Sequence, residues 1–470
     1  MLKIRFLKNE KLSTLFSFEN LIFLSFVLIA ISINTSIADF DDKKINIIFI
    51  FNFFRFISPI FIFISLIYIF FKKNYVLPNL FKLFIAYGII QFIFYLLNKN
   101  PIFAFQEYIL IISLVCLCLI FVISLKENFK LENYYFFLIA IISVISIYYT
   151  CNVLYEIFID GRKYLYISKT FIPEAANFIY QQNPRSTGVS RQLCLVLCFL
   201  IFFSSNKISN KFLLLKYSIY IIIFFISAVI WGFQSRGGLI SFILIWSIFF
   251  IIDKRKFVKK IFILFFLSIL PIIAFEALSE LNINYSQKFE EKPKATTRVF
   301  DKNKFILEKS EINKTTGDKI YTTKIDYTSG RIEIWKRSLN IFLKNPLIGY
   351  GPQGDRKSLS TDKTNIDPNQ KHIWDNNASN GIIYSALCGG IAGLVIFITI
   401  YLSQLLLLVK SLSQKKIFIT DDYLAKNAFV IVIMLNMRTV YENGFAVFGV
   451  DQIFLITCLT YLLKFNYPTK

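Results

Sequence analysis

The feature that most constrains this chain is its succession of long apolar runs. A helical run of about 17–25 apolar residues matches the hydrocarbon core of a bilayer, about 30 Å thick. The runs are continuous rather than alternating, which favours helices over the strands of a membrane barrel. We therefore predict an all-α, polytopic integral membrane protein of about 12 transmembrane helices. The predicted spans are residues 19–37, 45–71, 80–97, 102–125, 134–158, 191–204, 213–232, 237–252, 261–277, 381–409, 427–441 and 446–463.

Composition supports a membrane solvent. Hydrophobic residues make up 56% of the chain and charged residues 17%, whereas soluble domains average about 45–50% apolar and about 25% charged. The net charge of +22 would suggest a nucleic-acid partner in a soluble protein. Most lysines here lie in short loops beside apolar runs, where membrane topology requires them. We therefore expect the lipid bilayer and no nucleic acid as a partner.

The basic residues orient the chain. With the N-terminus inside, the cytoplasmic segments carry 23 basic residues, and the run at 253–260 is the densest. The short outer loops carry few, which is the bias of cytoplasmic loops toward Lys and Arg. We expect a multi-pass protein of the bacterial inner membrane with both termini cytoplasmic. The chain then divides into transmembrane helices 1–9 (1–277), a large periplasmic loop (278–380) and helices 10–12 (381–470).

The large loop has a distinct second half. Ile332, Trp335, Leu339 and Phe342 recur at helical spacing on one face, which predicts an amphipathic helix near 331–343. A helix with tryptophan on its apolar side is expected to lie on the membrane surface or on the top of the bundle.

Arginine is unevenly distributed. It supplies two of the 23 basic residues of the cytoplasmic segments but nine of the 28 on the outer side. Its planar fork binds phosphate through two parallel hydrogen bonds, so this placement favours a phosphate ligand outside. The candidate residues near span ends and in the loops are Arg185, Arg191, Arg236, Arg331 and Arg438.

Two candidates have a simpler interpretation, and for Arg236 it is a side chain that extends from the span end to the membrane interface. Arg438 lies one helical turn before Glu442, which is also the spacing of a helical salt bridge. Gly237 and Gly238 beside Arg236 permit close approach of either a ligand or another helix. The sequence contains no acidic pair in a good metal-site setting, so we expect no metal and no other cofactor.

Three motifs complete the pattern. The first is SRGG at 235–238, which opens a span. The second is Gly330-Arg331 followed by NPLIGYG at 345–351, and the third is ASNG at 378–381 leading to GGIAG at 389–393. With these motifs and its span plan, the chain resembles the O-antigen ligase/O-antigen polymerase family of bacterial membrane glycosyltransferases. Gly389 and Gly393 also form a GxxxG pair, a spacing that commonly serves only to pack helices.

The resemblance implies a reaction and its partners. The family takes a glycan from an undecaprenyl-diphosphate carrier and joins it to an acceptor hydroxyl, in a reaction that looks metal-independent. The acceptor is lipid A–core or protein for a ligase and another lipid-linked glycan for a polymerase, so the role lies in lipopolysaccharide biosynthesis at the cell envelope. Arginines matched here by Arg236 and Arg331 are expected to hold the diphosphate, with Arg185, Arg191 and Arg438 as further binding residues.

The chain departs from the family at one position. The third motif usually carries His-Asn, and this chain has Ser379-Asn380, which we expect to bind substrate. Its single histidine, His372, lies seven residues earlier. Either His372 reaches the site as the catalytic base, or the base is absent or reassigned. This departure favours polymerase slightly over ligase.

The alternative function from a different class is a lipid-linked glycan flippase or transporter. Such proteins often show internal repeats and carboxylates at the middle of the membrane. No repeat is visible in this sequence, and Glu107, Glu156 and Glu276 lie near predicted span ends. These features favour the glycosyltransferase.

Overall fold

A computed structural model describes the part of the chain that holds most of these motifs. It covers residues 78–97, 186–206, 211–232, 235–278, 331–361, 378–445 and 450–466, with a few internal gaps, together with a hairpin between 306 and 325 and parts of 135–151. The predicted spans 19–37, 45–71 and 102–125 lie outside the described residues.

The described residues form a bundle of apolar helices. Five are long and apolar enough to cross a membrane: α4 (Asn79–Leu97), α10 (Leu213–Gly232), the helix Phe257–Leu278, α17 (Gly381–Ser413) and α19 (Tyr423–Tyr441). The helix Phe257–Leu278 begins as α12 (Phe257–Leu264) and passes through a π-helical turn, η4 (Phe265–Ile269). Shorter helices are α8 (Ser186–Phe203), α11 (Arg236–Ile252), α18 (Lys416–Ile419) and α20 (Val450–Asn466). The prediction of a helical membrane protein is confirmed to this extent, whereas the number twelve is not tested.

The large loop contains elements of its own. Its second half forms α14 (Arg331–Lys344) and α15 (Gly354–Thr361). Its first half contains strands β1 (Ile306–Ile312) and β2 (Lys319–Ile325), which pair antiparallel from Ile306 opposite Ile325 to Ile312 opposite Lys319. This hairpin was not part of the all-α expectation. The bundle itself is helical in the part of the chain that the structure describes.

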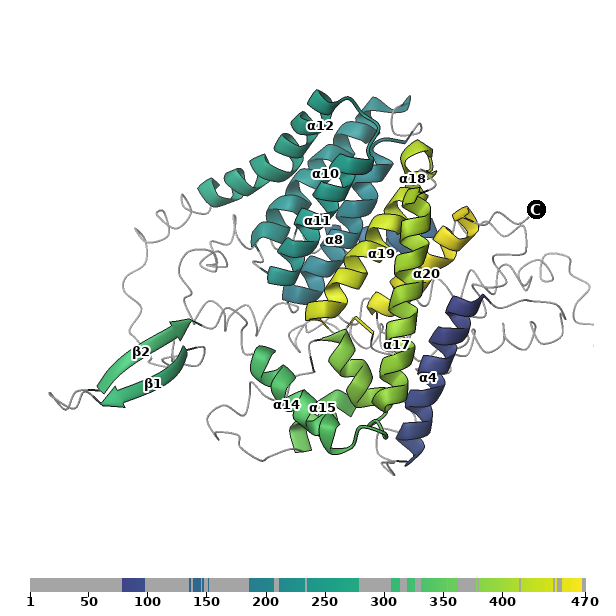
Figure 1. The fold of residues 1–470 in the computed structure, drawn as a ribbon. Helices are drawn as coiled ribbons and strands as arrows, with labels where there is room; N and C mark the ends of the chain where they lie inside the picture. Colours follow the sequence, from purple (N-terminus) through teal and green to yellow (C-terminus); the bar gives the residue numbers. More distant parts are fainter. Residues whose placement is uncertain are drawn as a thin grey trace, which may run out of the picture.

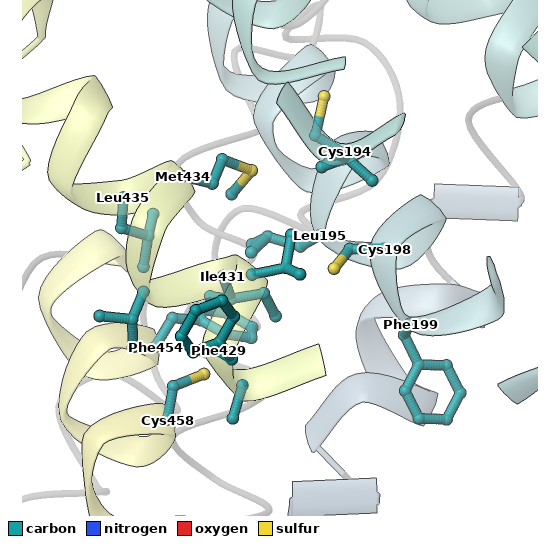
Figure 2. Packing of buried hydrophobic residues seen from close by; sticks show 14 of the residues in the cluster. Cys194, Leu195, Cys198, Phe199, Phe429, Ile431, Met434, Leu435, Phe454 and Cys458 are labelled. Carbon is teal, nitrogen blue, oxygen red and sulfur yellow. The ribbon is translucent and has the colours of Figure 1, made fainter. Parts of the chain in front are cut away.

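The centre of the bundle is α19. In its most apolar window, 78% of the residues are buried, against 28–39% in the other four candidate spans. Figure 2 shows its side chains, among them Phe429 and Met434, packed between Leu195 of α8 and Phe454 of α20. An apolar helix that is buried all round belongs inside a helical assembly rather than against lipid. The helix α19 therefore fixes how the ends of α8, α11 and α20 meet.

The neighbouring helices alternate in direction (Figure 1). The N-terminal ends of α8, α11 and α17 consequently gather around the C-terminal end of α19. Two contacts establish this arrangement: the side chain of Asn380 donates to the carbonyl of Val440 at 2.7 Å, and the hydroxyl of Tyr441 donates to the carbonyl of Gly237 at 3.3 Å. Figure 1 shows α14 and α15 at this same end of the bundle.

The long helix α17 is broken at Gly390. This residue has φ 58° and ψ −160°, which is not a helical conformation, and it belongs to a region that is essentially confined to glycine. The loop 346–351 crosses the break and pairs with the backbone groups that the break leaves open. The amides of Tyr350 and Gly351 donate to the carbonyls of Leu387 and Cys388 at 2.8 and 2.9 Å, and the amide of Ile391 donates to that of Pro346 at 2.9 Å. The second and third sequence motifs thus form one hydrogen-bonded unit.

Candidate functional site

The structure brings three of the predicted site residues to the end of the bundle where these helices meet. Arg191 lies in α8, Arg438 lies in the last turn of α19, and Asn380 precedes α17. Arg236 and Arg331 are the first residues of α11 and α14, and the structure describes their backbone but not their side chains. Arg185, His372 and Ser379 lie outside the described residues, so their predicted roles are not tested.

Arg191 and Arg438 share one carboxylate. A guanidinium nitrogen of Arg191, Nη1, lies 3.2 Å from Oδ1 of Asp451, and Nε of Arg438 lies 3.6 Å from Oδ2. The three side chains come from α8, α19 and the start of α20. We call them the arginine–aspartate cluster. It joins three helices at the end of the bundle through charges.

The cluster is buried, which sets its energetics. The side chains of Arg438 and Asp451 are 4% and 6% exposed, and that of Arg191 is 13% exposed. Two guanidinium groups so deep in a helical bundle would each carry a large desolvation cost without a counter-charge. Asp451 offsets both, and the cluster keeps a positive excess when these three groups alone are counted. Arg191 is its more accessible cation.

Sequence reasoning missed Asp451. It gave Arg438 a possible helical partner in Glu442, one turn away, but not Asp451 at the start of α20, whose Oδ2 lies 3.6 Å from Nε of Arg438. Glu442 lies at the C-terminal cap of α19, where its amide donates to the carbonyl of Arg438. A signal was available, because Asp451 falls inside the predicted span 446–463, where an ionisable residue marks a functional or paired position.

The glycines beside Arg236 serve helix packing. A Cβ atom at Gly237 would lie 2.8 Å from the ring of Tyr441, and one at Gly238 would lie 2.6 Å from Cβ of Ser190. Only glycine therefore allows α11 to approach α19 and α8 at this end. At Gly237 and Gly238 the group that approaches the backbone closely is a neighbouring helix. This close approach brings the backbone of Arg236 near the arginine–aspartate cluster.

Asn380 has a structural role in addition to its predicted one. Its Oδ1 accepts from the amides of Ile382 and Ile383 at 2.9 and 3.1 Å, which caps the start of α17 as asparagine commonly does. Its Nδ2 donates to Val440 at 2.7 Å. The side chain therefore fixes α17 against α19, and one amide hydrogen is left for another partner.

The predicted apolar face of α14 is only partly the face that packs on the bundle. Ile334, Ser338 and Ile341 are buried, whereas Ile332 and Leu339 are 43% and 51% exposed. The predicted face joins these two residues to Trp335 and Phe342, which are half-buried, and a period count cannot see that Ser338 is buried. The helix therefore carries apolar side chains on two sides, one of which packs on the protein.

The second half of the loop is tied to the start of α17. A side-chain oxygen of Asp355 accepts from the amide of Ala378 at 3.0 Å, and Arg337 donates to the carbonyl of Leu359 at 2.6 Å. Asp355 is buried and was not singled out in the sequence. These bonds hold α14, α15 and the segment before Asn380 together. The loop is thus anchored next to the cluster.

The arrangement suits an anionic ligand. The N-terminal ends of α8, α11 and α17 meet at this end of the bundle, and each helix N-terminus carries the equivalent of about half a positive charge. The arginines add full charges that cannot be lost by deprotonation. Among the described residues, no group of three His, Cys, Asp or Glu side chains could hold a metal ion. Backbone amides and guanidinium groups are therefore the binding chemistry that this part of the chain offers.

The chain was then compared with known proteins. Residues 221–398 match the family model described as O-antigen ligase. The match includes Arg236, Arg331, the loop 346–351 and the break in α17, whereas Arg191, Arg438 and Asp451 lie outside it. No curated protein matches the chain.

Proposed function

Because residues 221–398 match the family model described as O-antigen ligase, we propose that this chain transfers glycan from an undecaprenyl-diphosphate carrier to an acceptor at the periplasmic face of the inner membrane. One observation carries this proposal. Three helix N-termini, Arg191, Arg438 and the start of α11 at Arg236 gather at one end of a membrane bundle. A membrane-bound diphosphate is a ligand that such a site would bind.

The proposed reaction needs the diphosphate to leave. The acceptor oxygen attacks the anomeric carbon of the lipid-linked sugar while the bond from that carbon to the phosphate oxygen breaks. The bonding electrons pass to the diphosphate, and the proton of the acceptor hydroxyl passes to a base. Arg236 and Arg331 stabilise the charge that develops on the departing diphosphate, so no metal is required. His372 is our candidate for the base.

The burial of the cluster separates the roles of its arginines. We propose that Arg191, the more exposed one, reaches toward the phosphate with Arg185. Arg438 is nearly fully buried, so it contributes by holding Asp451, which in turn orients Arg191. Asn380 positions the start of α17, and Ser379 contacts the acceptor side of the site.

Arginine substitutions test the proposal in cells. Arg236→Ala and Arg331→Ala are each expected to abolish glycan display while the protein remains inserted in the membrane. Arg236→Lys and Arg331→Lys should recover only part of it, because lysine cannot form the two parallel bonds. Arg356→Ala, in α15 of the same loop, is the matched control and should behave as wild type. Normal display by a stable Arg236→Ala/Arg331→Ala double variant would refute the proposal.

The acceptor is tested by glycan length. We propose a polymerase, because Ser379 stands where the family motif usually has histidine. Deleting the gene should then remove long chains and leave a single attached repeat unit. Loss of all attached glycan would instead identify a ligase that acts on lipid A–core or protein.

A further inference from the structure

The second half of the large loop presents an apolar surface of exposed side chains in the part of the chain that the structure describes. Exposed side chains run along one side of α14 and into the loop that follows. They are Ile332 (43% exposed), Leu339 (51%), Leu343 (61%), Leu347 (71%) and Ile348 (39%). We call these five residues the outer stripe. Large apolar side chains that gather on one exposed face mark an interaction surface.

The outer stripe is not the side of α14 that packs on the protein. The opposite side buries Ile334 and Ile341 in a cluster with Tyr384, Leu387 and Cys388 of α17. That side also buries Ser338. Because α14 is already seated on α17, the stripe remains available for a second, different partner.

The stripe is continuous with the exposed apolar surface of a candidate membrane span. The carbonyl of Pro346 accepts from the amide of Ile391 at 2.9 Å, so Leu347 and Ile348 lie beside the break in α17. From that point α17 exposes further apolar side chains, among them Ile391, Val395 and Ile398, which are 43%, 55% and 45% exposed. These residues belong to the candidate span Gly381–Ser413, whose exposed apolar side chains we expect to face lipid.

The charges beside the stripe fit a phospholipid surface. Lys336 and Lys344 are exposed on the same helix, and at helical spacing Lys336 lies directly beside Ile332, Leu339 and Leu343. Lysines at that position can lay their stems along apolar surface and reach phosphate groups with their ammonium ends. Exposed apolar side chains with flanking cations are the pattern of a helix that lies in the bilayer interface.

We propose that the outer stripe inserts into the outer leaflet of the bilayer and anchors the second half of the loop to the membrane surface. The partner is the phospholipid bilayer rather than a protein, because the stripe continues the lipid-facing surface of α17. One consequence rests on the proposed function: Arg331, the first residue of α14, is then held near the depth of phosphate groups, where the diphosphate of a membrane-bound carrier lies.

Photocrosslinking of the full-length chain tests the proposal. A benzophenone amino acid is placed singly at Leu339, Leu343, Asn345 or Val395, and the purified protein is irradiated in nanodiscs of phosphatidylethanolamine and phosphatidylglycerol. Asn345 is exposed at the end of α14 and, at helical spacing, falls on the side away from Leu339 and Leu343, so it serves as the matched control. Val395 is the positive control for lipid contact. Mass spectrometry then measures covalent phospholipid adducts.

Adducts at Leu339 and Leu343 should match the yield at Val395, and Asn345 should give little or none. Equal and low yields at Leu339, Leu343 and Asn345 would overturn the proposal. Crosslinks from the stripe to a second copy of the chain would overturn it as well. If a variant no longer elutes as wild type in size-exclusion chromatography, the benzophenone amino acid is placed at Ile332 instead. The same outcomes then apply. Because lipid contact needs no turnover, this experiment can fail or succeed independently of the proposed reaction.

Discussion

At the scale of single residues, the burial of Asp451 decides how the arginines at the end of the bundle behave. One carboxylate lies within 3.2 Å of Arg191 and 3.6 Å of Arg438. Removing one partner of a buried ion pair leaves an uncompensated charge and costs about 3–5 kcal/mol. Asp451→Asn keeps the size of the side chain and removes its charge. We expect this variant to lower the midpoint of thermal unfolding in detergent strongly and to reduce glycan display.

An exposed pair in the same chain supplies the control for Asp451→Asn. Asp421 lies 2.7 Å from Lys254, and its side chain is 70% exposed. Asp421→Asn makes the same chemical change where solvent screens the charges, so its effect should stay below about 1 kcal/mol. Equal shifts in the unfolding midpoint of the two variants would show that the arginine–aspartate cluster is not energetically distinct.

The sequence could identify the arginines but not their partner. The excess of arginine on the outer side indicated Arg191, Arg236 and Arg438, because residue type and position relative to a predicted span can be read from the sequence. Asp451 at the start of α20 pairs with Arg438 of α19 and with Arg191 of α8, and no local pattern in the sequence contains that information. The capping role of Asn380 was likewise hidden, because it depends on where α17 begins and on which carbonyl of α19 lies opposite.

At the scale of elements, the junction between the loop 346–351 and the broken helix α17 explains two sequence motifs at once. A Cβ atom at Gly349 would lie 2.3 Å from the carbonyl oxygen of Cys388, and one at Gly390 would lie 2.7 Å from that of Leu347. Both glycines are therefore required by close backbone contact. A Cβ atom at Gly389 would lie 3.8 Å from Gln91 and Ile90 of α4, which is an ordinary contact, and one at Gly393 would lie 3.0 Å from the carbonyl oxygen of Ser385 in α17 itself. The described contacts of Gly389 and Gly393 therefore do not show the close approach of two helices that their GxxxG spacing suggested.

Two adjacent glycines allow a matched test of the junction. Gly390→Ala places a side chain at φ 58°, in a backbone region that costs about 1–3 kcal/mol for other residues, and adds the clash with Leu347. Gly389→Ala meets only ordinary contacts at 3.8 Å. We expect Gly390→Ala to lose glycan display and to show faster proteolysis of the loop, and Gly389→Ala to retain both properties. Wild-type behaviour of Gly390→Ala would contradict the junction.

Most elements in the described part of the chain were predictable within a few residues. The span predicted at 213–232 coincides with α10 (Leu213–Gly232), and the helix predicted near 331–343 is α14 (Arg331–Lys344). The bounds of such helices can be predicted from hydrophobic runs, because the residues that become buried in lipid or protein are apolar. The orientation of α14 could not be predicted, since apolar residues occupy two of its sides. The hairpin between 306 and 325 was also missed, because that segment is rich in charged residues.

At the scale of the whole molecule, the orientation in the membrane follows from charge. The basic residues at 253–260 lie between α11 and α12 and in the first turn of α12, at the end of the bundle opposite to the arginine–aspartate cluster. We expect a fluorescent protein fused after residue 256 or 470 to fluoresce, because the charge bias predicts that both positions are cytoplasmic. Alkaline phosphatase fused after residue 325 should be active, since the same bias predicts a periplasmic loop. Active alkaline phosphatase fused after residue 470 would indicate the opposite orientation, with the arginine–aspartate cluster on the cytoplasmic side.

The central claim is that the end of the bundle near Arg236 and Arg331 performs glycan transfer from a lipid diphosphate. Its most direct test is reconstitution of the purified chain in liposomes with undecaprenyl-diphosphate-linked labelled glycan, a second lipid-linked glycan as acceptor, and a chelator. The account predicts longer labelled glycan and stoichiometric release of undecaprenyl diphosphate from wild type. It predicts neither from the Arg236→Ala/Arg331→Ala variant. Movement of the labelled lipid across the bilayer without any lengthened product would contradict the account and identify a flippase instead.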